Sequence, residues 1–170
     1  DFFQMAEYND SCPASSIIHM KFPRTDGKGT ITLTWMDGGL LPKRPEELLP
    51  DEAMGGGDSG NGFIFEGHRG KLIGNYNSAP VLLPTSRMKE VTFPKQTIPR
   101  IPGAENGHYT EWVDACLAGY GKKELSSPFE FAGPFTEAVL MGNLAIRSYG
   151  MRINKGFPGR KKLLWDAKNM

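Results

Sequence analysis

Apolar and polar residues alternate along several short segments of the chain, which is the pattern of half-buried β-strands. In residues 16–22, and again in residues 30–35, apolar side chains fall at every second position. The Asp26-Gly27 pair between these segments favours a tight turn, because both residue types tolerate the positive φ angles of hairpins. We therefore predict a β-hairpin in this part of the chain.

A second hairpin is predicted from residues 62–66 and 71–74, with a short further strand over residues 81–84. The stretch from 37 to 62 that precedes it is long, irregular and rich in glycine and proline. Ordered loops of this length are often functional. Residues 84–107 contain four prolines, so we expect them to run extended over the surface.

The later part of the chain has the apolar period of α-helices. A first helix is indicated by apolar residues at i, i+3, i+4, i+7 and i+8, namely Tyr109, Trp112, Val113, Cys116 and Leu117. A second helix is predicted from Pro134 to Tyr149, and its wide apolar surface suggests burial on most sides. A short last strand is predicted over residues 161–166.

Strands that come first and helices that come later are typical of an α+β protein. We predict a mostly antiparallel open sheet with helices packed on one face. The chain has 170 residues, of which 39% are hydrophobic, which suffices for one sizeable core. We therefore expect residues 1–170 to form a single domain.

The charges nearly cancel, with 20 Lys and Arg against 19 Asp and Glu. This balance argues against a nucleic-acid partner and against a polybasic membrane contact. No apolar run approaches the roughly 20 residues that cross a bilayer. The sequence begins at Asp1 without a Met or a signal pattern, so we expect a processed chain or part of a longer protein. Its compartment, cytoplasmic or periplasmic, is left open.

Cysteine and histidine give no metal or catalytic pattern. The sequence leaves a disulfide between Cys12 and Cys116 open, and we expect Cys116 to be buried on the apolar face of its helix. His19, His68 and His108 lie far apart without ligand spacing, so no zinc site is predicted.

Residues 55–60 match the Gly-x-Gly-x-x-Gly pattern of dinucleotide-binding sites. In such sites a strand precedes the glycines and a helix follows them, so that the helix N-terminus holds the pyrophosphate. Here a proline-containing loop precedes the glycines and a predicted strand follows. We interpret the segment as a flexible loop.

Four polar residues are candidates for contact with a small polar substrate. His108 begins the first predicted helix, and helix N-termini favour anionic ligands. Asp37, Arg44 and Arg87 lie in predicted loops. The alternatives are a helix-capping or packing role for the histidine and a solvated surface for the other three. Acidic pairs such as Asp51-Glu52 are interpreted as solvated.

Several segments, taken in order, resemble one protein family. They include Leu33-Thr34-Trp35-Met36-Asp37-Gly38-Gly39, Phe63-Ile64-Phe65-Glu66-Gly67-His68-Arg69-Gly70, Ser86-Arg87-Met88-Lys89-Glu90, Gly107-His108-Tyr109-Thr110-Glu111-Trp112, Ala132-Gly133-Pro134-Phe135 and Leu164-Trp165-Asp166. Together they are similar to the C-terminal domain of the bacterial glucose–fructose oxidoreductase and inositol dehydrogenase family (Gfo/Idh/MocA).

The resemblance implies a parent protein in which an N-terminal Rossmann domain binds NAD or NADP. The C-terminal domain of such proteins lines the pocket of a sugar or cyclitol-like substrate and often mediates homo-oligomerisation. The family's catalytic Lys lies in a Glu-Lys-Pro motif of the first domain, which this sequence lacks. The family's frequent catalytic His has no counterpart here either. We therefore expect no catalytic or cofactor-binding residue in this chain, and we expect those elements upstream of Asp1.

Two alternatives remain open at this stage. The first is a stand-alone carbohydrate-binding or assembly module without redox activity. The second is a relative whose parent has lost the catalytic Lys. An upstream nucleotide-binding unit with Glu-Lys-Pro would favour the oxidoreductase over both.

Overall fold

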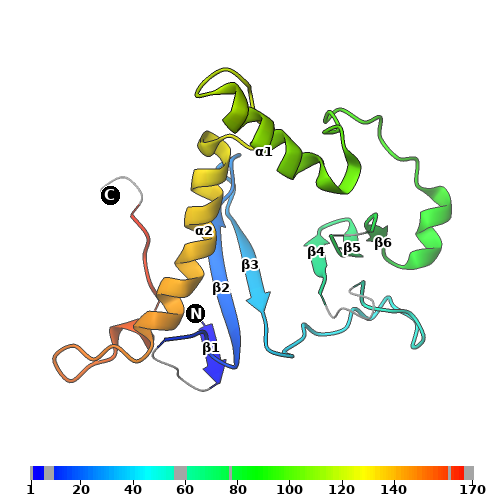
Figure 1. Cartoon of the computed structure of the whole chain (residues 1–170). Helices are drawn as coiled ribbons and strands as arrows, with labels where there is room; N and C mark the ends of the chain where they lie inside the picture. Colours follow the sequence, from blue (N-terminus) through cyan, green and yellow to red (C-terminus); the bar gives the residue numbers. More distant parts are fainter. Residues whose placement is uncertain (1, 6–9, 56–60, 77, 161, 167–170) are drawn as a thin grey trace. The chain divides into compact units, whose positions relative to one another are not determined.

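The computed structural model describes the chain in five stretches, residues 2–5, 10–55, 61–76, 78–160 and 162–166. It is an α+β protein with two open antiparallel sheets of three strands each (Figure 1). The predicted fold class is therefore confirmed. Contacts divide the chain into two compact units. The first unit comprises residues 1–35 and 96–170, and the second unit comprises residues 36–95. The assignment of residues 1–170 to one substrate-side domain stays a prediction.

The first unit contains the sheet of β1 (Phe2–Met5), β2 (Ser15–Pro23) and β3 (Thr30–Met36), in that order. The predicted strands of this hairpin are confirmed, whereas β1 was not expected from the sequence. Along β2, buried Ile18 and half-buried Met20 and Phe22 alternate with exposed His19 and Lys21. This is the period of two on which the prediction rested.

The turn between β2 and β3 is held by backbone and side-chain hydrogen bonds. The backbone N–H of Arg24 donates to the carbonyl of Gly29 over 3.0 Å, and Gly27 has a φ of +70°. Asp26 Oδ1 accepts from Arg24 Nε at 2.9 Å and from the Lys28 backbone N–H at 3.0 Å. Asp26 therefore closes the turn that Gly27 makes possible.

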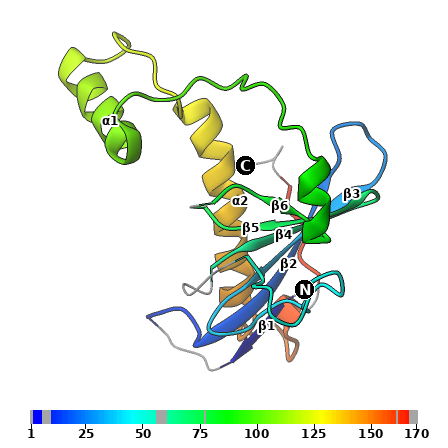
Figure 2. The ribbon, with the colours of Figure 1, turned by 90° about the vertical axis from the view of Figure 1, so that its right-hand side faces the viewer.

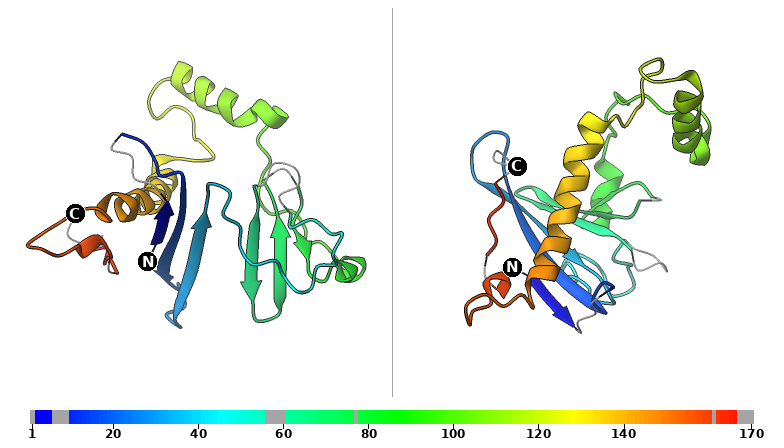
Figure 3. Two further views of the ribbon diagram at one scale, coloured as in Figure 1. Left: turned by 90° about the horizontal axis from the view of Figure 1, so that it is seen from below. Right: turned by 60° about the vertical axis from the view of Figure 1, so that its left-hand side comes forward.

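Helix α2 (Phe129–Ser148) packs against β1 and β2, and Figure 1 shows it running along β2. The contact depends on Gly142, which is buried in the helix. A Cβ atom at Gly142 would lie 3.3 Å from Cδ1 of Ile18, which is itself only 6% exposed. A side chain at Gly142 would therefore require Ile18 or the helix to shift by a few tenths of an ångström. Figure 3 shows the yellow-to-orange helix α2 and the blue strands of its sheet from two further sides.

The prediction that the second helix begins at Pro134 was wrong. The helix begins at Phe129, because the carbonyl of Pro128 accepts the N–H groups of Phe131 and Ala132 at 3.0 and 2.9 Å. Pro134 instead lies inside the helix, where its missing N–H leaves one helical hydrogen bond unmade.

The predicted burial of the helices was also wrong. Helix α1 (Gly107–Ala118) follows the short 3₁₀ helix η3 (Ala104–Asn106) and is capped at its C-terminal end by Gly119. Its Cys116 is nevertheless exposed, and both cysteines are free. Apolar side chains are exposed along both helices, namely Tyr109, Trp112, Val113, Leu117, Phe131, Phe135, Val139, Leu140 and Leu144. An apolar stripe is buried only where another element covers it.

The second unit contains β4 (Phe63–Gly67), β5 (Gly70–Gly74) and β6 (Val81–Leu82), paired antiparallel as neighbouring strands (Figure 2). Its core is formed by Leu48, Ile73 and Leu83, which are at most 7% exposed. The 3₁₀ helix η2 (Thr85–Glu90) follows β6, so this part of the segment predicted to be extended is helical.

The C-terminal segment differs from the prediction as well. Residues 162–166 form no strand, and Lys161 lies outside the described residues. After the 3₁₀ helix η4 (Pro158–Arg160), the segment is held by Trp165, whose Nε1 donates to Glu137 Oε1 at 2.7 Å. A side-chain bond to α2 thus takes the place of a strand ladder. Over the described ranges, no helix is both long and apolar enough to cross a membrane.

Replacing Leu83 tests the small core of the second unit. Leu83→Ala removes a side chain that is 1% exposed, so we expect a loss of about 3 kcal/mol in the free energy of unfolding. Leu41→Ala is the matched control, because Leu41 is 66% exposed and its loss changes stability by less than about 0.5 kcal/mol. Equal effects of the two variants in urea unfolding would contradict this core.

Candidate functional site

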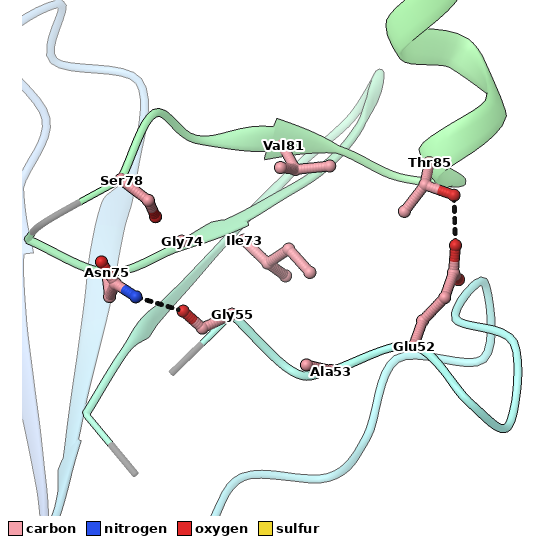
Figure 4. A pocket seen from close by; sticks show the side chains of 9 residues that line it. All are labelled: Glu52, Ala53, Gly55, Ile73, Gly74, Asn75, Ser78, Val81 and Thr85. Atoms are coloured by element: carbon pink, nitrogen blue, oxygen red, sulfur yellow. Dashed lines mark hydrogen bonds between the residues drawn. The ribbon is translucent and has the colours of Figure 1, made fainter. Parts of the chain in front are cut away.

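The second unit contains an open cavity of about 370 Å³. This volume lies within the range of roughly 300–1,000 Å³ that is typical of small-molecule sites. The lining combines polar with small or apolar residues, namely Glu52, Asn75, Ser78 and Thr85 with Ala53, Gly55, Ile73, Gly74 and Val81. Figure 4 shows Glu52 and Thr85 at one end and Asn75 and Ser78 at the other.

The apolar middle of the cavity comes from the sheet. Ile73 on β5 and Val81 on β6 are cross-strand partners, and Ile73 is 3% exposed. The loop that forms the opposite wall reaches the end of β5 through two glycines. A Cβ atom at Gly55, where φ is +87°, would lie 2.8 Å from the backbone nitrogen of Gly74. Only glycine allows the two backbones to come this close.

Glu52 provides the charged end of the cavity. Its carboxylate accepts hydrogen bonds from the Thr85 hydroxyl and, at 2.8 Å, from the Leu49 backbone N–H. The hydrogen bond from Thr85, followed by the one from Leu49 and the charge of Arg44, holds the pKa of Glu52 below its ordinary value. Glu52 is therefore a carboxylate at neutral pH and acts as a hydrogen-bond acceptor.

Asn75 and Ser78 form the neutral polar end. Asn75 Nδ2 donates to the Gly55 carbonyl at 2.9 Å, which ties the end of β5 to the loop (Figure 4). The side chain of Ser78 is exposed beside it. Hydroxyl and amide groups both donate and accept hydrogen bonds. The cavity thus offers an anionic acceptor at one end, neutral polar groups at the other and an apolar strip between them.

The loop wall is also fixed by the ion pair of Lys71 with Glu47 and by hydrogen bonds from the Arg44 guanidinium. Lys71 Nζ on β5 lies 2.9 Å from Glu47 Oε2, and this hydrogen bond raises the pKa of Lys71 and lowers that of Glu47. Arg44 Nη2 donates to the carbonyls of Leu49 and Glu52, the latter at 2.6 Å. These bonds hold the backbone that carries Glu52.

The described residues that line the cavity bring one carboxylate, from Glu52, together with the hydroxyls of Ser78 and Thr85 and the amide of Asn75. None of these described lining residues is a His, Cys or Lys. Within the described ranges, no group of three or more His, Cys, Asp and Glu side chains is placed to hold a metal ion. Hydrogen-bonding groups at both ends of an apolar strip are a common feature of sites that bind small molecules.

None of the four candidate residues from the sequence lines the cavity. Asp37 is half-buried in a turn where its carbonyl accepts from Leu40 N–H at 3.3 Å. Arg44 supports the Glu52 backbone. Arg87 Nη1 donates to the carbonyls of Arg69 and Leu83, both at 3.3 Å, and so joins η2 to the β4–β5 turn.

His108 belongs to the first unit, whereas the other three candidates belong to the second. It is exposed near the start of α1, and its ring centroid is 3.9 Å from that of Tyr109. A contact of these four residues with substrate stays a prediction.

Sequence reasoning missed the residues that line the cavity. Glu52 belongs to an acidic pair that reads as solvated, and only the fold brings it to Thr85 over a separation of 33 residues. Asn75 and Ser78 follow a strand without forming a known motif. In the glycine segment 55–60, Gly55 lines the cavity and residues 56–60 lie outside the described residues.

The lowered pKa of Glu52 predicts a pH dependence of stability. The folded chain favours the carboxylate, so its contribution is complete above the ordinary value near 4.5 and is lost as pH falls through the lower folded pKa. Glu52→Gln should lower the melting temperature at neutral pH, and its difference from the native chain should shrink as pH falls below the ordinary value and through the lower folded pKa. A difference that is constant with pH would contradict the assigned bonds. Thr85→Val should reduce the same pH dependence.

Comparison with known proteins adds no family to this description. No protein-family model matches the sequence, and no curated protein matches it. The resemblance to the oxidoreductase family therefore rests on the ordered segments of the sequence, and the site rests on its own geometry.

Proposed function

We propose that this chain is the C-terminal, substrate-side and assembly domain of an NAD(P)-dependent oxidoreductase of the Gfo/Idh/MocA type. The parent protein would transfer hydride between the nicotinamide and a sugar or cyclitol-like substrate. The N-terminal Rossmann domain would hold the cofactor and the catalytic Lys. The chain by itself would bind and orient but would not catalyse.

The single observation that carries this proposal is the cavity of the second unit, which has polar groups at both ends of an apolar middle. Its carboxylate, amide and hydroxyl groups can each bind a hydroxyl group, so they suit a molecule that carries several hydroxyls. Binding without chemistry is the role expected of a substrate-side domain, because a nicotinamide supplies the hydride when it is bound.

Exposed apolar surface supports the assembly part of the proposal. Trp35 on β3, Trp112 on α1 and Phe135 on α2 are each more than half exposed. Contiguous exposed apolar surface usually marks an interaction site. A chain that normally packs against further domains or copies would present such surfaces.

Each cavity group has a defined task in this proposal. Glu52 would accept hydrogen bonds from one or two substrate hydroxyls. Because its carboxyl group is ionised at neutral pH, it acts there only as an acceptor. Asn75 and Ser78 would bind hydroxyls at the other end. Arg44 would act through the Glu52 backbone as a positioning residue.

A stand-alone carbohydrate-binding module is the second candidate. It is favoured by the fact that the described residues that line the cavity all lie in the second unit. A parent sequence with a strand, Gly-x-Gly-x-x-Gly, a helix and Glu-Lys-Pro upstream of Asp1 would favour the oxidoreductase.

Titration of the chain with NAD and NADP tests its non-catalytic role. We expect no heat of binding by calorimetry, because no described strand and helix flank the glycine segment 55–60 as a pyrophosphate site needs. Micromolar affinity for either nucleotide would contradict the interpretation of that segment as a loop.

Titration with myo-inositol or glucose tests the cavity. We expect weak binding, with NMR shift changes centred on Ile73, Asn75, Ser78 and Val81. Ser78→Ala should weaken binding by about fivefold through one lost hydrogen bond, with the fold preserved because its side chain is exposed. Asn143→Ala is the polar control, since Asn143 is exposed on α2. Shift changes confined to the first unit, or equal affinities of the two variants, would contradict the site.

A further inference from the structure

Although the net charge of the chain is near zero, acidic and basic residues are separated along its C-terminal half. Residues 96–137 contain six Asp and Glu against three Lys and Arg. Residues 138–165 contain six Lys and Arg and no Asp or Glu. The change of sign falls within α2, whose Glu130 lies in the first turn and whose Arg147 lies in the last. One end of this helix is therefore acidic and the other is basic.

The outer face of α2 is apolar at its middle. Leu140 and Leu144 are each two residues from buried Gly142, which places them about 160° around the helix from the sheet contact. They are 51% and 48% exposed. Residues four apart are neighbours on a helix surface, so the two leucines form one apolar patch.

Opposite charges flank this patch symmetrically. Glu137 and Arg147 are each five residues from Gly142. Trp165 donates a neutral N–H to Oε1 of Glu137, which leaves the negative charge of the carboxylate in place. Arg147 is exposed, and Lys and Arg side chains near a helix C-terminus are also favoured by the helix dipole.

The positive end is extended by a fixed guanidinium beyond the helix. Arg160 Cζ lies 4.7 Å from the ring centroid of Tyr149 and 4.0 Å from that of Phe157. Its Nε donates to the Tyr149 carbonyl at 3.4 Å. These contacts hold the charge of Arg160 beside the C-terminal end of α2.

We infer that a second copy of the chain covers this face, with its α2 antiparallel to the first. The inference rests on the assembly part of the proposed function. In a two-fold pair centred at Gly142, Leu140 faces Leu144 of the partner subunit and Glu137 faces Arg147 of the partner subunit. Two copies thus bury four leucines between two ion pairs, and the two helix dipoles oppose each other favourably.

The charges select this orientation over the others. In a parallel pair, Glu137 would face Glu137 of the partner subunit and Arg147 would face Arg147 of the partner subunit. The like charges would repel each other at both ends of the helices. An anionic membrane or a nucleic acid would attract the basic end but would be repelled by Glu130 and Glu137. A second copy is the partner that complements both ends.

A charge swap across the proposed pair tests the inference. Sedimentation of the native chain at about 0.05 M salt should show a dimer that weakens as salt is raised. Glu137→Arg and Arg147→Glu should each raise the dimer dissociation constant by about tenfold, because like charges then meet twice. The double variant should return to within about threefold of the native value, since the ion pairs re-form with reversed sign.

Matched variants separate the ion pair from other effects. Glu137→Gln keeps an acceptor for Trp165 while it removes the charge, so it should weaken the dimer less than Glu137→Arg. A swap of the exposed Lys43–Glu46 pair in the second unit should leave the dimer unchanged. Circular dichroism of each variant verifies that α2 is still formed.

Three results would overturn the inference. They are a monomeric native chain at millimolar concentration, dissociation constants that are the same for all variants, and a double variant as weak as the weaker single one. Binding of a monomeric chain to anionic vesicles or to nucleic acid would likewise overturn the inference. Binding of myo-inositol or glucose by the cavity is measured separately, so failure here is distinguishable from failure of the proposed function.

Discussion

The scarcity of apolar burial is the constraint on which this structure depends. Among the described residues, the buried apolar side chains are Ile18, Leu48, Ile73 and Leu83, whereas large apolar side chains on β3, α1 and α2 are exposed. Burying one such side chain contributes about 1.5–3 kcal/mol, and each ordered residue costs about 1–2 kcal/mol in backbone entropy. A surface outside the chain is therefore expected to supply burial that the chain does not provide for itself.

Within this constraint, a few close contacts hold each unit. In the first, Gly142 lets α2 approach Ile18 on β2. In the second, the Leu48, Ile73 and Leu83 cluster anchors the loop against β5, and Gly55 reaches the end of that strand. The cavity exists because this loop is fixed on both sides, by Arg44 along its backbone and by Asn75 at its end.

Local patterns predicted local structure well and tertiary contacts poorly. Alternation at Ile18, Met20 and Phe22 identified β2, and the Asp26-Gly27 pair identified its turn. The start of the second helix was missed because Pro128 and Pro134 both mark a possible first turn. Cys116 was predicted to be buried, but no described element covers it. Glu52 was missed because its partner Thr85 is distant in sequence. Contacts of this kind carry no local signal.

Urea unfolding of the dilute chain measures the central claim directly, because the m-value is proportional to the surface that unfolding exposes. For small proteins this slope is roughly 1–3 kcal/mol per molar urea and rises with chain length. We expect a slope near the lower end for the monomer despite its 170 residues, and a steeper one at concentrations where copies associate. A slope near the upper end under monomeric conditions would show that the apolar surfaces are buried within the chain, and would contradict the claim.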